Sequence, residues 1–447
     1  MEEMGDIQTL QNFFTTRKIS NLTDDQNIAY KAFLGGRNIL ITGQAGTGKS
    51  HLVRKIVATC ERSKRNYAVT AMTGAAASLI SGKTIHSWGC LGIGDKSATI
   101  TAEKILKSWP AKSKWRKCRV LIIDEVSMMN SQFFELIEEV ARIVKGSDRA
   151  FGGIQVVLLG DFYQLPPVSK NGDNSKFCFE SDVWEKVMDD KVTLTEIIRQ
   201  KDPIFQKVLS EVRVGQVSPE SIEILCSRVG VEPDLSTGII PTILYSRKIA
   251  VEKVNKREFN KLPTDEIMEY EATYEIIGER KKAMKEEEIE RWSLIVDKEN
   301  NYEKVLQLAM GAQVMLLKNI DQEKGLVNGS RGVVVGFEEN DLPMVKFLNG
   351  EIETIRYQEY SYEISHVSEI VAKQIPLALA WCTTIHKSQG QSLDSVKINI
   401  GRGIFEYGQS YVALSRARSL EGLFIEAFDP KLIKIHPKVQ QFFESYK

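Results

Sequence analysis

The chain has 447 residues, of which 43% are hydrophobic and 26% charged, and its 59 lysine and arginine residues balance its 59 aspartate and glutamate residues. This composition predicts a globular protein of about two to four domains without a membrane-spanning run, and the neutral total argues against a wholly basic coat protein for nucleic acid. The six cysteines form no Cys-x-x-Cys pair, which argues against a zinc or disulfide framework, and Met1–Asp6 lacks the features of a leader, so we expect an intracellular protein of the nucleus or cytoplasm.

A glycine-rich loop follows the first apolar run, Asn38–Thr42. Residues 43–50 read Gly-Gln-Ala-Gly-Thr-Gly-Lys-Ser, and a helix is expected from Lys49 to about Cys60. Glycines let the backbone curl so that its N–H groups, with the positive end of the helix dipole, face phosphate oxygens. Lys49 can reach the β- and γ-phosphates, and the Ser50 hydroxyl can bind Mg²⁺. We predict a site for a nucleoside triphosphate, ATP in an ATPase, formed by Gly43, Ala45, Gly46, Thr47, Gly48, Lys49 and Ser50.

A basic stretch comes before the next long apolar run. Residues 107–119 contain six lysine and arginine residues and no acidic residue. The stretch is either a solvated connection between a helix and a strand or a surface near a phosphate backbone, and the sequence leaves both interpretations open.

The apolar run Val120–Ile123 ends in two acidic residues, Asp124 and Glu125. Four apolar residues in a row indicate a buried parallel strand, and ligands of open α/β sheets bind at the carboxyl ends of such strands. Asp124 is the candidate Mg²⁺ ligand, and Glu125 is the candidate general base for the attacking water. A solvated strand end is the alternative, but the buried strand before it favours the catalytic role.

Short strands alternate with helices through the first 200 residues and again after residue 239, which predicts an α/β fold with parallel sheets. The expected strands are Asn38–Thr42, Ala68–Met72, Val120–Ile123, Ile154–Gly160, Ile239–Leu244, Leu377–Thr383, Ser395–Ile400 and Leu423–Ala427, and the expected helices include Ser131–Val144, Lys248–Phe259 and a charged one over Gly278–Arg291. Short strands with close Gly and Asn turns over residues 311–356 indicate instead a small antiparallel barrel.

Three further polar residues stand at the ends of these arrays. Gln164, in Gly160–Pro167, could sense the γ-phosphate, because an amide can bond both an oxygen and a water. Arg199 lies just beyond the first array, and Arg416 lies in Tyr411–Arg418 near the end of the second. A forked guanidinium can stabilise the charge that grows on a transferred phosphoryl group, so both arginines are catalytic candidates.

With these motifs in this order, the chain resembles the Pif-type (petite-integration-frequency) DNA helicases of superfamily one, group B, and more distantly the RecD and Dda helicases. The resemblance runs from Leu22 to about Pro430. Beyond the motifs above it rests on Thr70–Ala76, Thr84–Trp88, the signature segment Ser127–Ala141, Phe151–Gln155, Leu326–Val333 and Thr384–Gln391.

The resemblance implies two RecA-like P-loop NTPase domains with a small inserted wedge and an inserted SH3-like β-barrel. The expected ranges are 1–21 for an N-terminal segment, 22–190 for the first domain with its wedge at about 88–110, 191–302 and 374–447 for the second domain, and 303–373 for the barrel. The long N-terminal segment and the large barrel insertion of some relatives are expected to be absent.

The resemblance also implies roles for single residues. Gln26 should read the adenine, Gln389 and Gly390 should couple nucleotide to DNA, and Gln164, Arg199 and Arg416 should contact the γ-phosphate. The implied contacts with single-stranded DNA are Thr73, Gly74, His86, Trp88, Thr384, His386 and Lys387. Trp88 could stack on a base or pack in the core, and both roles stay open.

The implied function is that of an ATP-dependent, Mg²⁺-using 5′ to 3′ DNA helicase acting in replication, repair or recombination. Single-stranded and forked DNA are the expected partners, guanine quadruplexes and RNA–DNA hybrids are further substrates of the family, and a monomer of cellular or viral origin is expected. A translocase that does not separate strands, a passive nucleotide-gated DNA-binding module and an attached nuclease are the alternatives. Intact Lys49, Glu125 and Arg416 disfavour the passive module, and the five dispersed histidines give no support to a nuclease.

Overall fold

The computed structural model describes residues 22–445 except 93, 95, 168–175, 237, 264–266, 279–285, 300–301, 322, 366–367 and 402. The expected N-terminal segment, residues 1–21, lies outside them. The chain divides into two compact units. The first runs up to Phe162 and includes Pro166–Arg199, and the second contains Tyr163–Leu165 and the chain from Gln200 onward.

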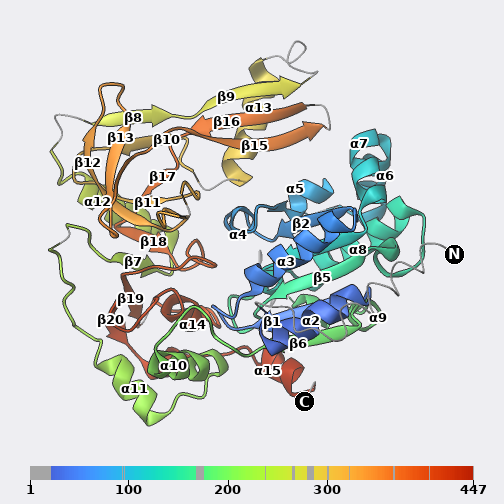
Figure 1. Cartoon of the computed structure of the whole chain (residues 1–447), viewed down its shortest axis with the longest axis horizontal. Helices are drawn as coiled ribbons and strands as arrows, with labels where there is room; N and C mark the ends of the chain where they lie inside the picture. Colours follow the sequence, from blue (N-terminus) through green and yellow to red (C-terminus); the bar gives the residue numbers. More distant parts are fainter. Residues whose placement is uncertain are drawn as a thin grey trace. The chain divides into compact units, whose positions relative to one another are not determined.

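The first unit is built on a six-stranded parallel sheet in the order β3-β2-β4-β5-β1-β6 (Figure 1). Its strands are β1 (Ile39–Gly43), β2 (Tyr67–Ala71), β3 (Lys83–Thr84), β4 (Val120–Asp124), β5 (Gln155–Gly160) and β6 (Asp190–Leu194). Its helices are α2 (Asp24–Leu34), α3 (Lys49–Arg62), α4 (Gly74–Leu79), α5 (Ile85–Gly89), α6 (Ala98–Lys107), α7 (Trp109–Lys117), α8 (Ser131–Lys145) and α9 (Trp184–Val187). The predicted α/β fold is confirmed.

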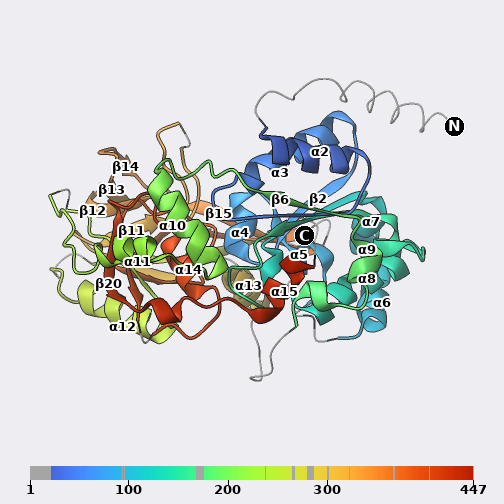
Figure 2. The ribbon, with the colours of Figure 1, turned by 90° about the horizontal axis from the view of Figure 1, so that it is seen from below.

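Every residue of β1, β4 and β5 is buried, which explains why these strands read as continuous apolar runs. The register pairs Thr42 of β1 with Gly160 of β5, and Ala71 of β2 with Asp124 of β4. The carboxyl ends of these strands therefore meet at one edge of the sheet, and α2 and α3 lie side by side next to β1 (Figures 1 and 2).

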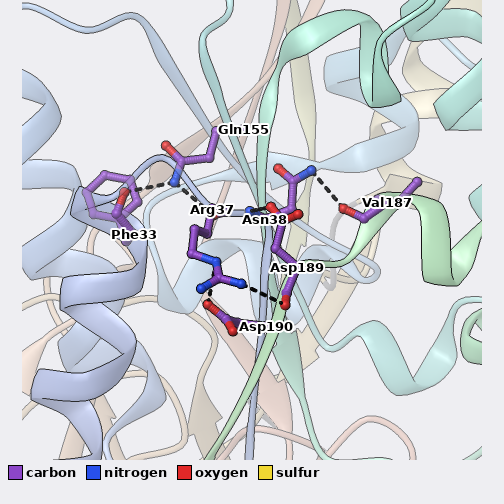
Figure 3. Close-up of polar contacts among 7 residues, drawn as sticks. All are labelled: Phe33, Arg37, Asn38, Gln155, Val187, Asp189 and Asp190. Carbon is purple, nitrogen blue, oxygen red and sulfur yellow. Dashed lines mark hydrogen bonds and ion pairs between the residues drawn. The ribbon is translucent and has the colours of Figure 1, made fainter. Parts of the chain in front are cut away.

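A polar network fixes the opposite, amino end of β1 (Figure 3). Asn38 donates its backbone N–H to Asp189 Oδ2 at 2.7 Å and its side-chain amide to Val187 O at 2.8 Å. Gln155 Nε2 donates to Phe33 O at 2.8 Å, and Arg37 Nε lies 2.8 Å from Asp190 Oδ2. These bonds tie the α2–β1 turn to the starts of β5 and β6, so β1 is held in register from the end remote from its glycine-rich loop.

The second unit contains a four-stranded parallel sheet in the order β18-β7-β19-β20 (Figure 1). The strands are β7 (Thr242–Tyr245), β18 (Cys382–Thr384), β19 (Val396–Ile400) and β20 (Leu423–Phe428), and the helices around them are α10 (Pro203–Val214), α11 (Pro219–Cys226), α12 (Lys248–Phe259), α14 (Gln409–Leu414) and α15 (Pro437–Glu444). One buried apolar cluster joins α10, α14 and the sheet strands.

Among its described residues, the second unit also contains three antiparallel sheets. Five strands pair in the order β14-β13-β12-β11-β17, namely β11 (Gln313–Leu316), β12 (Arg331–Phe337), β13 (Pro343–Phe347), β14 (Ile352–Thr354) and β17 (Leu377–Leu379). Whether this five-stranded sheet closes into an SH3-like barrel stays a prediction. The other two are the pair β8 (Met268–Glu271) and β10 (Val305–Leu308), and the trio β9 (Thr273–Gly278), β15 (Gln358–Ser365) and β16 (Ser368–Gln374), which packs against α13 (Glu286–Glu299).

Three sequence predictions need correction. The domain boundary after residue 190 is too early, because β6 pairs with β1 and the first unit continues to Arg199. The charged helix placed over Gly278–Arg291 is wrong in its bounds, since Gly278 ends strand β9 and the described helix begins at Glu286. The single strand Leu377–Thr383 is two strands of different sheets, β17 and β18.

Candidate active site

The glycine-rich loop connects β1 to α3 and leaves no room for side chains at two positions. A Cβ at Gly43 would lie 2.7 Å from Leu194 O, and one at Gly48 would lie 2.6 Å from Gln26 Nε2. Gly48 also has a left-handed φ of +81° and gives α3 no side-chain cap. Because no side chain caps the start of α3, the positive end of this helix suits the predicted phosphate site.

The side chain of Lys49 lies back over this loop. Its Nζ donates to Gly43 O at 2.7 Å and to Gln44 O at 3.2 Å. Thr47 instead uses its hydroxyl within the loop, donating to Gln44 O at 2.9 Å. The loop thus presents backbone N–H groups and one cation, while Ala45, Gly46 and Ser50 lie partly exposed beside them.

Asp124 and Glu125 stand at the end of β4, at the same edge of the sheet as the loop. Asp124 is buried, and one of its oxygens accepts the Glu125 N–H at 2.8 Å. Burial, and next the charge of Glu125, raise the pKa of Asp124, while Lys49 acts to lower it. A buried carboxylate short of compensating positive charge suits a divalent cation, and with the Ser50 hydroxyl it offers the oxygen ligands that Mg²⁺ prefers.

Glu125 has a left-handed backbone, with a φ of +54°. This conformation is costly for a residue with a Cβ, and such strain persists mainly where the surrounding structure enforces it, often at functional sites. The backbone therefore turns sharply at Glu125, directly after the carboxylate of Asp124.

The structure gives Gln26 a different set of partners from the one predicted. Gln26 is fully buried, its Nε2 donates to Thr47 O at 3.0 Å, and its Oε1 accepts the Thr23 N–H at 3.2 Å. Both ends of the amide are thus engaged, and the residue joins the start of α2 to the phosphate loop. An amide has a second N–H and a second lone pair beyond these two bonds, so adenine recognition by Gln26 is compatible with them and stays a prediction.

Arg199 and Gln164 fall on different units. The backbone N–H of Arg199 donates to Gly46 O at 3.2 Å, and its neighbour Ile198 does the same at 2.8 Å, so this segment lies on the phosphate loop. Gln164 belongs to the second unit, where its buried Oε1 accepts no hydrogen bond.

Arg416 is only 1% exposed and is bonded within the second unit. Its Nη1 donates to Ser388 O at 3.2 Å and to Gln391 O at 3.0 Å, and its Nε donates to Val412 O at 2.9 Å. The two carbonyls bracket Gln389 and Gly390. The structure therefore brings the two predicted coupling residues and the predicted arginine finger together, and it gives the guanidinium a structural role that the sequence pattern did not indicate.

Three predicted DNA contacts in the first unit sit on short capped helices. The Thr73 hydroxyl accepts the Ala76 N–H at 3.2 Å and so caps α4, which begins at Gly74. His86 of α5 stacks on Phe133 with ring centroids 4.4 Å apart.

Trp88, the fourth predicted contact in this unit, is 8% exposed and packs on Trp115 with centroids 4.8 Å apart. Its burial favours the core-packing role over base stacking.

In the second unit, Thr384 makes the same kind of turn as Thr73, in which a threonine hydroxyl accepts a backbone N–H three residues further on. The Thr384 hydroxyl accepts the Lys387 N–H at 3.1 Å, and Thr384 and Lys387 line a cavity of about 430 Å³. Burial lowers the pKa of His386, so its imidazole tends to be neutral.

Helix α12 supplies cavity residues that the sequence analysis missed, namely Lys248, Glu252, Asn255 and Lys256. Their spacing places them on one helix face, which is the signal that could have found them.

Comparisons with known proteins show which family this chain resembles. Residues 21–221 match the family model of the PIF1-like helicase, and residues 296–337 match that of the DNA helicase Pif1 2B domain. The ATP-dependent DNA helicase PIF1 of Xenopus laevis is 41% identical over 426 residues, which cover 94% of this chain and 64% of that protein. The chain thus spans less than two thirds of the curated relative that it matches.

Solved structures of the same family are similar along nearly the whole chain. The crystal structure of the Pif1 helicase from Candida albicans is 34% identical with a TM-score of 0.79, and the match covers 95% of this chain and 99% of that one. Pif1 from Bacteroides in complex with ADP-AlF3 and single-stranded DNA is 30% identical with a TM-score of 0.64, covering 95% and 97%. Across the described residues, every helix is too short or too polar to cross a bilayer.

Proposed function

The chain belongs to the PIF1-like helicase family, and we propose that it is an ATP-dependent DNA helicase that moves 5′ to 3′ on single-stranded DNA and separates duplex strands. The observation that carries the proposal is the meeting of the phosphate loop with Asp124 and Glu125 at one sheet edge. The direction of movement rests on the family alone. Roles in replication, repair or recombination, and activity on quadruplexes or hybrids, rest on the same resemblance.

In the proposed ATP site, the N–H groups of the glycine-rich loop and Lys49 bind the β- and γ-phosphates. Ser50 and Asp124 would hold Mg²⁺, which when bound neutralises charge on the phosphate oxygens. Glu125 orients the attacking water and accepts its proton. Gln164, Arg199 and Arg416 then stabilise the charge that develops on the γ-phosphoryl group. Because Arg416 is 1% exposed and donates to Ser388 O and Gln391 O, this role requires part of its guanidinium to become accessible to the phosphate.

The cavity beside Thr384 and Lys387 is proposed to bind the tracking strand. Three lysines line it, Lys248, Lys256 and Lys387, together with two glutamates, Glu252 and Glu303, and the amides Asn255 and Gln391, so the lysines outnumber the acidic residues. Cations and amides of this kind suit phosphate and sugar groups and read no base sequence, as a translocase requires. Thr73, Gly74 and His86 of the first unit are proposed as further contacts. The residues around 88–110 are proposed as the strand-separating wedge.

Strand displacement by the purified chain tests this function. Duplexes with a 5′ tail, a 3′ tail or both are incubated with ATP and Mg²⁺, and the released strand is measured on a gel. We expect release only when a 5′ tail is present. ATPase activity stimulated by single-stranded DNA without any release would favour the alternative, a translocase that does not separate strands.

Replacing Glu125 by Gln should preserve the binding of ATP and DNA while slowing hydrolysis by about 10²–10⁴-fold, the usual contribution of a general base. The amide keeps the size of the side chain and the same left-handed backbone, but it cannot accept the proton of water. Steady-state turnover and nucleotide titration measure the two effects. Glu139→Gln, an exposed change on α8, is the control, and failure of Glu125→Gln to bind nucleotide would mark Glu125 as structural.

Replacing Lys387 by Ala should weaken binding of single-stranded DNA by a similar factor for every sequence, and should reduce the slope of log affinity against log salt by about one. The reason is the loss of one phosphate contact and of the counterion that it releases. Fluorescence anisotropy at several salt concentrations measures the slope. Lys207→Ala, which removes an exposed cation paired with Glu220 outside the cavity, should leave it unchanged. An unchanged slope in Lys387→Ala would exclude this contact.

A further inference from the structure

The ring of Tyr163 is contacted by two groups of the second unit that lie outside the sequence motifs. Phe443 of α15 stacks on it with ring centroids 4.8 Å apart and an angle of 14° between the ring planes. The guanidinium carbon of Arg213, from α10, lies over the same ring at 4.5 Å from its centroid. Tyr163 directly precedes Gln164, so these contacts act on the residue proposed to sense the γ-phosphate.

The backbone around Gln164 is also anchored in the second unit. Leu165 is completely buried in the apolar cluster that includes Phe205 and Val208 of α10 and Tyr411 of α14. Gly408, which precedes α14, approaches so closely that an added Cβ would lie 2.4 Å from Gln164 O. Helix α10 lies beside α14 in both views (Figures 1 and 2).

The same helix α14 leads directly to Ser415 and Arg416. The main chain of Gln164 therefore lies against the start of this short helix at Gly408, and Arg416 follows its end along the chain. Gln164 Oε1 is buried and accepts no hydrogen bond, so no polar partner holds this oxygen, and the placement of the backbone that carries the side chain matters for its position.

We propose that Tyr163, Arg213 and Phe443 form a clamp that holds Gln164 in place relative to Arg416, and that Phe443 of α15 is a positioning residue for ATP hydrolysis. The inference rests on the proposed function. Phe443 does not touch the nucleotide and acts through Tyr163. A displacement of about 1 Å at a catalytic group can cost about 100-fold in rate, so a change at α15 can affect turnover.

The experiment compares Phe443→Ala with Gln440→Ala, an exposed change on the same helix. In Phe443→Ala we expect kcat with saturating single-stranded DNA to fall about 10- to 100-fold, with KM for ATP and Kd for DNA within about twofold of the wild type. We expect kcat to fall while KM and Kd stay unchanged, because the phosphate loop binds nucleotide in the first unit, whereas the clamp positions Gln164 in the second. Gln440→Ala should behave as the wild type.

Two further variants distinguish a role in positioning Gln164 from a role in stabilising the fold. Phe443→Tyr keeps the stacked ring and should retain kcat, whereas Arg213→Gln removes the cation from the other contact and should lower kcat with KM unchanged. Phe443→Ala and Arg213→Gln combined should lower kcat by less than the product of the two single effects, because both act through one ring. If Phe443→Ala fails to fold, Arg213→Gln alone carries the test.

The outcomes are distinct. A folded Phe443→Ala with wild-type kcat, or an Arg213→Gln with wild-type kcat, overturns the clamp while the helicase function stands. A decrease in kcat that disappears when the assay is run well below the melting temperature of the variant also overturns it. A wild-type chain without DNA-stimulated ATPase activity overturns the proposed function and the clamp together.

Discussion

Replacing Lys49 by Ala is expected to reduce ATP hydrolysis to the background of the assay. The ammonium group is the only cation that the phosphate loop itself supplies, because residues 43–48 contain neither lysine nor arginine. Without it the charge on the β- and γ-phosphates is not balanced as the bond breaks. Turnover is measured with and without single-stranded DNA, and nucleotide affinity is measured by titration. Both should fall, turnover far more than affinity.

The same substitution also removes two hydrogen bonds, from Lys49 Nζ to the buried carbonyls of Gly43 and Gln44. Gln44 O keeps the Thr47 hydroxyl as a donor, so the main cost falls on Gly43 O, and we expect a loss of unfolding free energy of about 1–3 kcal/mol at most, the usual cost of leaving a buried acceptor unpaired. That is less than the typical stability of a domain, so the variant should stay folded at the assay temperature. Lys55→Ala, further along α3, removes an equal charge and should keep normal turnover. Near-normal turnover in Lys49→Ala would refute the site.

Local sequence patterns predict a strand well when all of its residues lie in the same environment, such as the buried interior. Strands β1, β4 and β5 are buried on both faces, so their apolar runs predicted them within one or two residues. The run from Leu377 to Thr383 is equally apolar, but its two ends pair with different sheets. Apolar character does not specify the pairing partner, so the change of sheet could not be seen.

The missed sheet of β9, β15 and β16 has a different cause. Tyr360 and Tyr362 alternate with polar residues along β15, which is a visible period of two. Because this segment falls within residues 303–373, the range expected for the barrel, the predicted domain boundaries assign it to the barrel. The signal was present, and the assumed domain boundary concealed it.

For the candidate site, spacing identified residues but not their partners. The loop 43–50 is defined by short-range geometry, and the structure places it as predicted at the carboxyl end of β1. Gln26 and Arg416 show the limit, since their partners Thr47 and Ser388 are distant in sequence and are main-chain carbonyls that any residue type could supply. No pattern of side chains encodes such a bond.

Replacing Arg416 by Ala should leave nucleotide affinity nearly intact and reduce DNA-stimulated turnover by about 10³–10⁵-fold, the range known for arginine fingers in phosphoryl transfer. The affinity persists because the phosphate loop lies in the first unit and is unchanged. ATPase rates with and without single-stranded DNA, together with nucleotide titration, measure both effects. Arg416→Lys should not restore turnover, since an ammonium group lacks the planar fork.

The structure makes a stability control necessary for this variant, because Arg416 also bonds to the carbonyls of Ser388, Gln391 and Val412. A purely structural arginine would give a loss that follows the unfolding curve and recovers in the cold. A finger would give a folded protein that binds ATP and DNA yet stays inactive at every temperature, and added guanidinium ion would partly restore its turnover. Arg418→Ala, which removes an exposed partner of Asp394 two residues away, should behave as the wild type. Wild-type stimulation by DNA in Arg416→Ala would refute the finger role while leaving the ATP site in place, because Lys49 and Glu125 are tested separately. Binding without turnover, under conditions where the variant is fully folded, is therefore the result that assigns Arg416 to the chemical step.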